Sequence, residues 1–66
     1  MNVVVNGEAR SVAERASVDD LARALGASAT GVAVAVNEEV VARSAWATTG
    51  LSDGDRVEVL GAMQGG

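Results

Sequence analysis

The chain has 66 residues, of which 48% are apolar and 21% charged, with a formal net charge of -4 and no cysteine or histidine. Without these two residue types it has no thiolate nucleophile, no imidazole base and no nitrogen or sulfur ligand for zinc. A chain this short forms one thin core, in which a pocket of about 300 Å³ or more for a small molecule is not expected. We therefore expect neither catalytic residues nor a metal site.

The charges argue against nucleic acid as a partner. Five arginines and no lysine stand against nine acidic residues, without any basic run, so the sequence offers no surface that could follow phosphates. The longest apolar stretches, 3–5 and 32–36, are far shorter than the roughly 18 residues of a membrane span. The first residues also lack the basic and apolar segments of a signal peptide. We therefore expect a cytoplasmic protein without membrane contacts.

The first half of the chain predicts a β-hairpin followed by a short helix. Residues 1–13 contain an apolar β-branched start, the hairpin signal Asn6-Gly7 and a loosely alternating second strand. Residues 18–25 place apolar side chains at helical spacing. Ser17 is suited to cap this helix, and Asp20 stands at the capping-box position. A helix of about two turns is not stable alone, so it must pack on the sheet.

The second half predicts further strands. Residues 32–36 alternate valine and alanine, which indicates an interior strand with the bulky valines facing the helix. Trp46, the one aromatic residue, is interpreted as a core side chain. The remaining segments, in chain order, are a turn at 37–39, a return strand at 40–41, an irregular stretch at 43–50, a turn at 52–55, a last strand at 56–60 and a mobile tail at 61–66.

These elements have the order β-β-α-β-β-β. They predict an α+β fold of the β-grasp (ubiquitin-like) class, with a mixed sheet of about five strands packed on one short helix. We expect a single domain over residues 1–66, in which 60 residues are globular and 61–66 form a flexible tail that ends in Gly65-Gly66.

Several short segments resemble one family of ubiquitin-like proteins. Arg43-Ser44-Ala45-Trp46 resembles an Arg-x-x-Trp element, and Asp53-Gly54-Asp55 lies in a segment that leads into the last strand. Together with the length and the terminal Gly65-Gly66, they make the whole chain similar to the ThiS family of sulfur carriers in thiamine biosynthesis. One residue departs from the pattern, because Ala42 stands where the family often has proline.

The chemistry of a carrier would be concentrated at the last residue. The Gly66 carboxylate is ionised at neutral pH and is a poor electrophile, so it must be adenylated before a sulfur donor can convert it into a thiocarboxylate. Glycine suits the narrow channel of such an enzyme because it has no side chain. Gly65, Gln64 and Met63 are therefore predicted to enter the channel of the partner.

The resemblance implies partners rather than a bound cofactor. They are a ThiF-like adenylyltransferase that holds ATP and Mg²⁺, a ThiG-like thiazole synthase and a sulfur donor protein. The residues leave other functions open: sulfur transfer for molybdopterin or cysteine synthesis, attachment to other proteins as a ubiquitin-like modifier, or an interaction domain with no chemistry at its end.

The last strand predicts where a partner docks. Val57 and Val59 alternate with Arg56, Glu58 and Leu60, so the valines should face the core. Arg56, Glu58 and Leu60 should then lie on the open side of the sheet, immediately before the tail. We expect Leu60 to be the apolar anchor of this docking surface.

Overall fold

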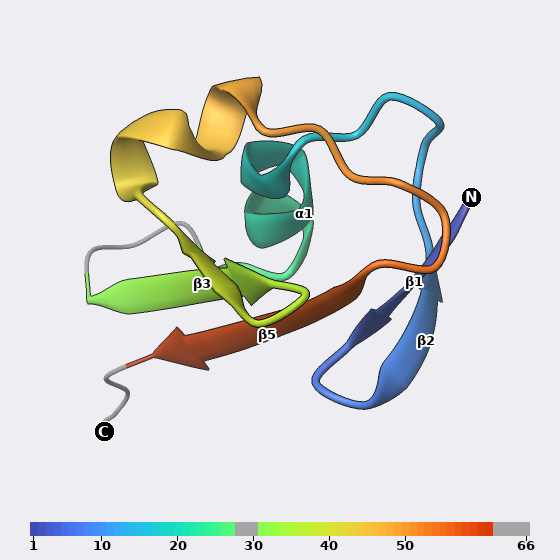
Figure 1. The fold of residues 1–66 in the computed structure, drawn as a ribbon, viewed down its shortest axis with the longest axis horizontal. Helices are drawn as coiled ribbons and strands as arrows, with labels where there is room; N and C mark the ends of the chain where they lie inside the picture. The colour runs from blue at the N-terminus through green and yellow to red at the C-terminus, as the bar shows by residue number, and fades with distance from the viewer. Residues whose placement is uncertain (28–30, 62–66) are drawn as a thin grey trace.

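The computed structural model describes residues 1–27 and 31–61. Its elements, in chain order, are β1 (Asn2–Val5), β2 (Glu8–Ser11), α1 (Val18–Ala24), β3 (Val32–Val36), β4 (Glu39–Val41), the 3₁₀ helix η1 (Arg43–Thr48) and β5 (Arg56–Gly61). The strands form one five-stranded sheet in the order β2-β1-β5-β3-β4. β5 pairs parallel with β1 and antiparallel with β3 at the centre of the sheet (Figure 1). The predicted β-grasp arrangement is confirmed.

Both hairpins turn through two residues in the left-handed region. Asn6 and Gly7 have φ of 50° and 86°, and Asn37 and Glu38 have φ of 52° and 72°. Positive φ at both central positions is the mark of a type I′ turn, whose twist matches that of the strands. Because two residues are enough for this turn, Glu39 belongs to β4 and not, as predicted, to the turn.

Helix α1 begins at the predicted residue, Val18, and ends at Ala24, one residue before its predicted end. The Ser17 hydroxyl accepts a hydrogen bond from the Asp20 N–H at 3.1 Å, and the Asp20 carboxylate accepts one from the Ser17 N–H at 3.0 Å. This reciprocal pair is a capping box. Gly26 follows the helix at φ 71°, and the N–H of the next residue donates to the Ala22 carbonyl at 2.7 Å. Such a bond closes a Schellman motif, which satisfies the last carbonyls of the helix.

The core lies between the sheet and the two helices, which cover the same face (Figure 1). Its buried cluster consists of Val3, Val5, Val18, Leu21, Ala22, Val34, Trp46, Leu51 and Val57. Val3, Val5, Val34 and Val57 are the strand residues of this cluster, and their neighbours along each strand point to the opposite face of the sheet. The strands therefore supply one side of the core and leave the other side of the sheet uncovered by helix.

Residues Arg43–Thr48 form a helix that the sequence did not predict, since we expected an irregular stretch. Trp46 is 2% exposed and its Nε1 donates to the Val41 carbonyl at 3.1 Å. The Arg43 guanidinium lies over the same ring, 4.3 Å from its centroid. The indole thus packs in the core, as interpreted from the sequence, and also connects η1 to β4.

β5 continues one residue beyond its predicted end. Gly61 pairs with Val32 of β3, so it belongs to the sheet, although we had assigned it to the tail. The rest of the predicted tail, residues 62–66, lies outside the described residues.

Candidate functional site

The side chains of β5 alternate between the core and solvent. Val57 is 1% exposed, whereas Arg56, Glu58 and Leu60 are exposed, with Leu60 at 69%. The predicted orientation of this strand is therefore confirmed. The role of these three side chains in docking stays a prediction. The neighbouring strands enlarge the surface that they form.

The strands beside β5 extend this surface with apolar side chains. Ala33 lies opposite Leu60, Ala35 lies opposite Glu58, and Val40 of β4 lies opposite Ala35. Directly opposed residues point to the same face of a sheet, so all five share one face. Val40 and Leu60 are the two large hydrophobic side chains that are exposed within the described residues, at 76% and 69%. We call this surface the open face; it consists of Arg56, Glu58, Leu60, Ala33, Ala35 and Val40.

Sequence reasoning missed the contribution of β4. A strand of three residues has too little alternation to show which of Val40 and Val41 faces solvent. The missing signal was the two-residue turn at Asn37 and Glu38, because that turn fixes the register of the strands on either side. Counting outward from it places Val40 opposite Ala35 and hence beside β5.

Charged residues border the open face at the start of β5. Arg56 Nη2 lies 3.6 Å from Glu38 Oε2, with side chains that are 65% and 80% exposed. An exposed pair of this kind adds little to stability. Because its charges remain accessible, it can instead orient an approaching partner, while the apolar side chains supply contact area.

β5 leads from the open face into the predicted carrier end. Leu60 is the last large side chain before Gly61, where the described strand ends. The predicted functional residues Met63, Gln64, Gly65 and Gly66 lie outside the described residues. The open face is therefore the described part of the candidate site, and the strand connects it to the rest.

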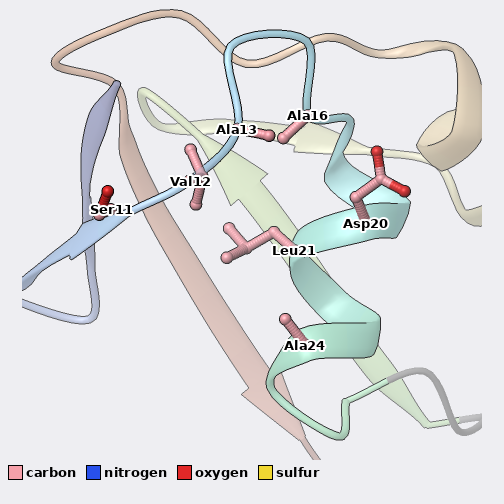
Figure 2. Close-up of a pocket in the computed structure, with 7 residues that line it drawn as sticks. All are labelled: Ser11, Val12, Ala13, Ala16, Asp20, Leu21 and Ala24. Carbon is pink, nitrogen blue, oxygen red and sulfur yellow. The ribbon is translucent and has the colours of Figure 1, made fainter.

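The described surface also has hollows, one of which shares Val40 with the open face. A groove of about 210 Å³ lies between α1 and the segment after β2. Among its lining residues, Val12 and Leu21 point toward one another (Figure 2). A shallow hollow of about 440 Å³ lies beside β4 and η1. It exceeds the size that we expected so short a chain to form, because it is a surface depression between elements and does not require a thicker core. The first is lined by one carboxylate, Asp20, and the second by one, Glu39.

Asp20 is a titratable group with a structural role in the described residues. The N–H of Ser17, and then its hydroxyl, lower the pKa of Asp20, whose carboxylate caps α1. Over residues 1–27 and 31–61, no three acidic side chains gather in a way that could hold a metal ion. Neither described helix has the length and apolar character that crossing a membrane requires.

Comparison with known proteins identifies a family. The model of the ThiS family matches residues 3–66. The sulfur carrier protein ThiS of Escherichia coli is 30% identical, and the match covers all of both chains. The crystal structure of the thiamine biosynthesis protein ThiS from Geobacter metallireducens is 45% identical, with a TM-score of 0.83 and complete coverage of both chains. The sequence matches and the structural match thus indicate the same family.

A larger protein also contains a region of this kind. A thiazole synthase of Paramagnetospirillum magneticum is 36% identical over 66 residues, which are the whole of this chain but 20% of that protein. The chain therefore spans one fifth of that relative, and the whole of the E. coli carrier. The chain belongs to the ThiS family, the sulfur carriers of thiamine biosynthesis, and the resemblance read from its sequence is confirmed.

Proposed function

We propose that this chain carries sulfur as a thiocarboxylate on Gly66 and delivers it for thiazole formation. The observation that carries the proposal is the family match, which runs through residue 66 and so includes the terminal Gly65-Gly66. The match to the E. coli sulfur carrier, which covers all of that protein, supports the same function. The chain would act as a carrier and co-substrate and not as a catalyst, in agreement with the names of its relatives.

Activation of the carboxylate is the first chemical step. A Gly66 carboxylate oxygen attacks the α-phosphorus of ATP, pyrophosphate leaves, and an acyl adenylate forms. A sulfur nucleophile at the oxidation level of sulfide then attacks the acyl carbon. A C–S bond forms, the bond from the acyl carbon to the AMP oxygen breaks, and AMP leaves. The resulting thiocarboxylate is ionised and nucleophilic, so it can attack an electrophilic carbon in the thiazole precursor.

The residues before Gly66 are proposed to reach into the active site of the partner. Five residues follow the described strand, and an extended chain spans roughly 3.3–3.6 Å per residue, or about 17 Å in all. Gly65 would fit where a narrow channel leaves no room for a side chain. Gln64 and Met63 would occupy its wider entrance.

Two enzymes and a sulfur donor are proposed as partners. ATP and Mg²⁺ would be bound by a ThiF-like adenylyltransferase, since the described residues include no cluster of acidic groups for a metal ion. A ThiG-like thiazole synthase is supported by the P. magneticum relative, which has that name and contains a region like this chain. We expect these reactions in the cytoplasm, where ATP is available.

The open face is the proposed docking surface for these partners. It combines exposed Leu60 and Val40 with the small side chains of Ala33 and Ala35, which leave the sheet accessible. Docking there would direct the end of β5 into the active site. The net charge of -4 favours a partner surface with basic residues around an apolar centre.

Reconstitution tests this function. The chain is incubated with the adenylyltransferase of its own organism, ATP, Mg²⁺ and hydrosulfide, and its intact mass is measured. We expect an ATP-dependent gain equal to the difference between one sulfur and one oxygen atom. A chain that lacks Gly66 is the control and should stay unmodified. Absence of any ATP-dependent mass change in the complete chain would overturn the proposal. Use of the product by a molybdopterin or cysteine enzyme, and not by a thiazole synthase, would assign another pathway.

A further inference from the structure

The parallel ladder between β1 and β5 continues past the end of β1 through a side chain. The Val4 N–H donates to the Asp55 carbonyl and the Asn6 N–H donates to the Val57 carbonyl, both at 2.9 Å. In a regular parallel ladder, the next bond would run from the Val59 N–H to the main-chain carbonyl of Asn6. The main chain has already entered the hairpin turn there, because Asn6 has φ of 50°.

The Asn6 carboxamide takes over these bonds. Its Oδ1 accepts a hydrogen bond from the Val59 N–H at 2.9 Å, and its Nδ2 donates to the Val59 carbonyl at 3.2 Å. One side chain thus presents the acceptor and the donor that a further peptide unit of β1 would present. No aliphatic side chain could do this, and glycine, which also suits the turn, would leave both Val59 groups to water.

Val59 lies close to the described end of β5, so the Asn6 bonds act where the carrier end begins. On the β3 side, this part of the strand is held by the pairing of Ala33 with Leu60 and of Val32 with Gly61. On the β1 side, β1 itself ends at Val5. Asn6 is therefore what holds this end of β5 from its second side.

The opposite end of β5 has a comparable arrangement. Asn37 occupies the same position in the other hairpin turn, with φ of 52°. Its Oδ1 accepts a hydrogen bond from the Arg56 N–H at 3.0 Å, and its Nδ2 donates to Asp55 Oδ1 at 3.0 Å. Two turn asparagines thus hold the two ends of one strand, and Asn37 provides a matched control that is remote from the carrier end.

We propose that Asn6 is a positioning residue for carrier activation: its two bonds to Val59 set the direction in which β5 delivers the carrier end to the adenylating enzyme. This rests on the proposed function of Gly66. If the bonds from Asn6 to Val59 were lost, docking through the open face would be unaffected. The Gly66 carboxylate, however, would reach the α-phosphate of ATP in productive geometry less often. The effect should therefore appear in kcat for adenylation and not in KM for the carrier.

Three variants test this role: Asn6→Gly, Asn6→Asp and Asn37→Gly. Glycine accepts the turn conformation at either position, so the two glycine variants share the same change in chain flexibility. Asn6→Asp keeps the acceptor for the Val59 N–H and loses the donor. Adenylation is measured as a function of carrier concentration, and amide hydrogen exchange is measured at Val59 and Gly61.

For Asn6→Gly we expect kcat to fall about tenfold at little change in KM, with faster exchange at Val59. Asn37→Gly should keep the native kcat, and Asn6→Asp should give an intermediate value. A native kcat for Asn6→Gly overturns the proposal, and so does an equal loss in Asn37→Gly, which would indicate a general loss of structure. Unchanged amide exchange at Val59 in Asn6→Gly would independently refute the role of the hydrogen bonds. If the native chain is not adenylated at all, the proposed function fails and not the role of Asn6.

Discussion

Neighbouring residues of β5 have opposite surroundings and hence separate effects. Val57 is 1% exposed and packs in the core, and burial of such a side chain is worth roughly 1.5–3 kcal/mol. Leu60, three positions later, is 69% exposed. A side chain that remains in water contributes little to folding, but it can lose its water on binding a partner. Substitutions at different positions of this one strand should therefore affect stability and docking separately.

Val57→Ala and Leu60→Ala should have opposite profiles. Val57→Ala removes two buried methyl groups and should lower the free energy of unfolding by about 1–3 kcal/mol, because the core repacks only in part. Leu60→Ala should change it by less than about 0.5 kcal/mol but weaken partner binding by roughly 1–2 kcal/mol. Urea unfolding and titration calorimetry with the adenylyltransferase measure the two effects. Unfolding of the domain by Leu60→Ala would show that the assigned faces are wrong.

At the scale of elements, one aromatic residue, Trp46, holds the short helix η1 against the core and the edge of the sheet. The helix is six residues long and has no amphipathic repeat that would announce it in the sequence. Its position depends on Trp46, whose ring is in the core while Nε1 bonds to the end of β4 at Val41. One side chain thus packs against the sheet and also binds the edge strand that carries Val40 of the open face.

Trp46→Phe should destabilise the chain by about 1–3 kcal/mol. The smaller ring leaves part of the indole volume empty, and the Val41 carbonyl loses the hydrogen bond from Nε1. Unfolding is followed by far-UV circular dichroism, because the variant lacks the one tryptophan. Thr48→Ala, an exposed change in the same helix, is the control and should cost less than about 1 kcal/mol. An unchanged midpoint for Trp46→Phe would contradict the role of the indole.

The capping box makes the stability of α1 depend on pH. Bonds from the Ser17 N–H and hydroxyl lower the pKa of Asp20, so the folded state favours the ionised carboxylate. Its contribution is complete above the unfolded pKa of about 3.9 and is lost as pH falls through the lower folded value. Asp20→Ala should therefore be less stable than the native chain at pH 7, and the difference should shrink below about pH 4. Chemical denaturation at several pH values measures it; a difference that stays constant down to pH 3 would contradict this explanation.

For the whole molecule, local sequence signals were enough for the order of the five strands and α1, but not for η1 or for the contacts that connect distant elements. The Asn6-Gly7 turn and the Ser17 cap involve neighbours in the chain, so composition and spacing reveal them. The bonds of Asn6 to Val59 join residues that are 53 positions apart, and they exist only because the sheet brings β1 beside β5. The exposure of Val40 likewise depends on the register of β3 and β4, which follows from the length of the turn between them and not from the alternation within β4.

The core and the proposed carrier end lie in separate parts of the chain. The buried cluster runs from Val3 to Val57, and the partly buried side chains packed against it extend to Val59. No core residue among those described comes from the last two positions of β5. We therefore expect that changes at the proposed carrier end have little effect on stability, so that the chemistry can be tested separately.

Deletion of Gly66 should abolish adenylation and leave folding unchanged. It removes the carboxylate at the proposed position but no side chain, so the free energy of unfolding should move by less than about 1 kcal/mol. Gly65→Val is the companion variant, which keeps the terminal carboxylate and adds bulk where a narrow channel is proposed. It should bind the adenylyltransferase with native affinity through the open face and yet react far more slowly. Thermal unfolding, calorimetry and pyrophosphate release measure stability, binding and chemistry in turn. Native reaction rates for Gly65→Val would refute the channel, and a large loss of stability on deleting Gly66 would show that the end of the chain contributes to the fold.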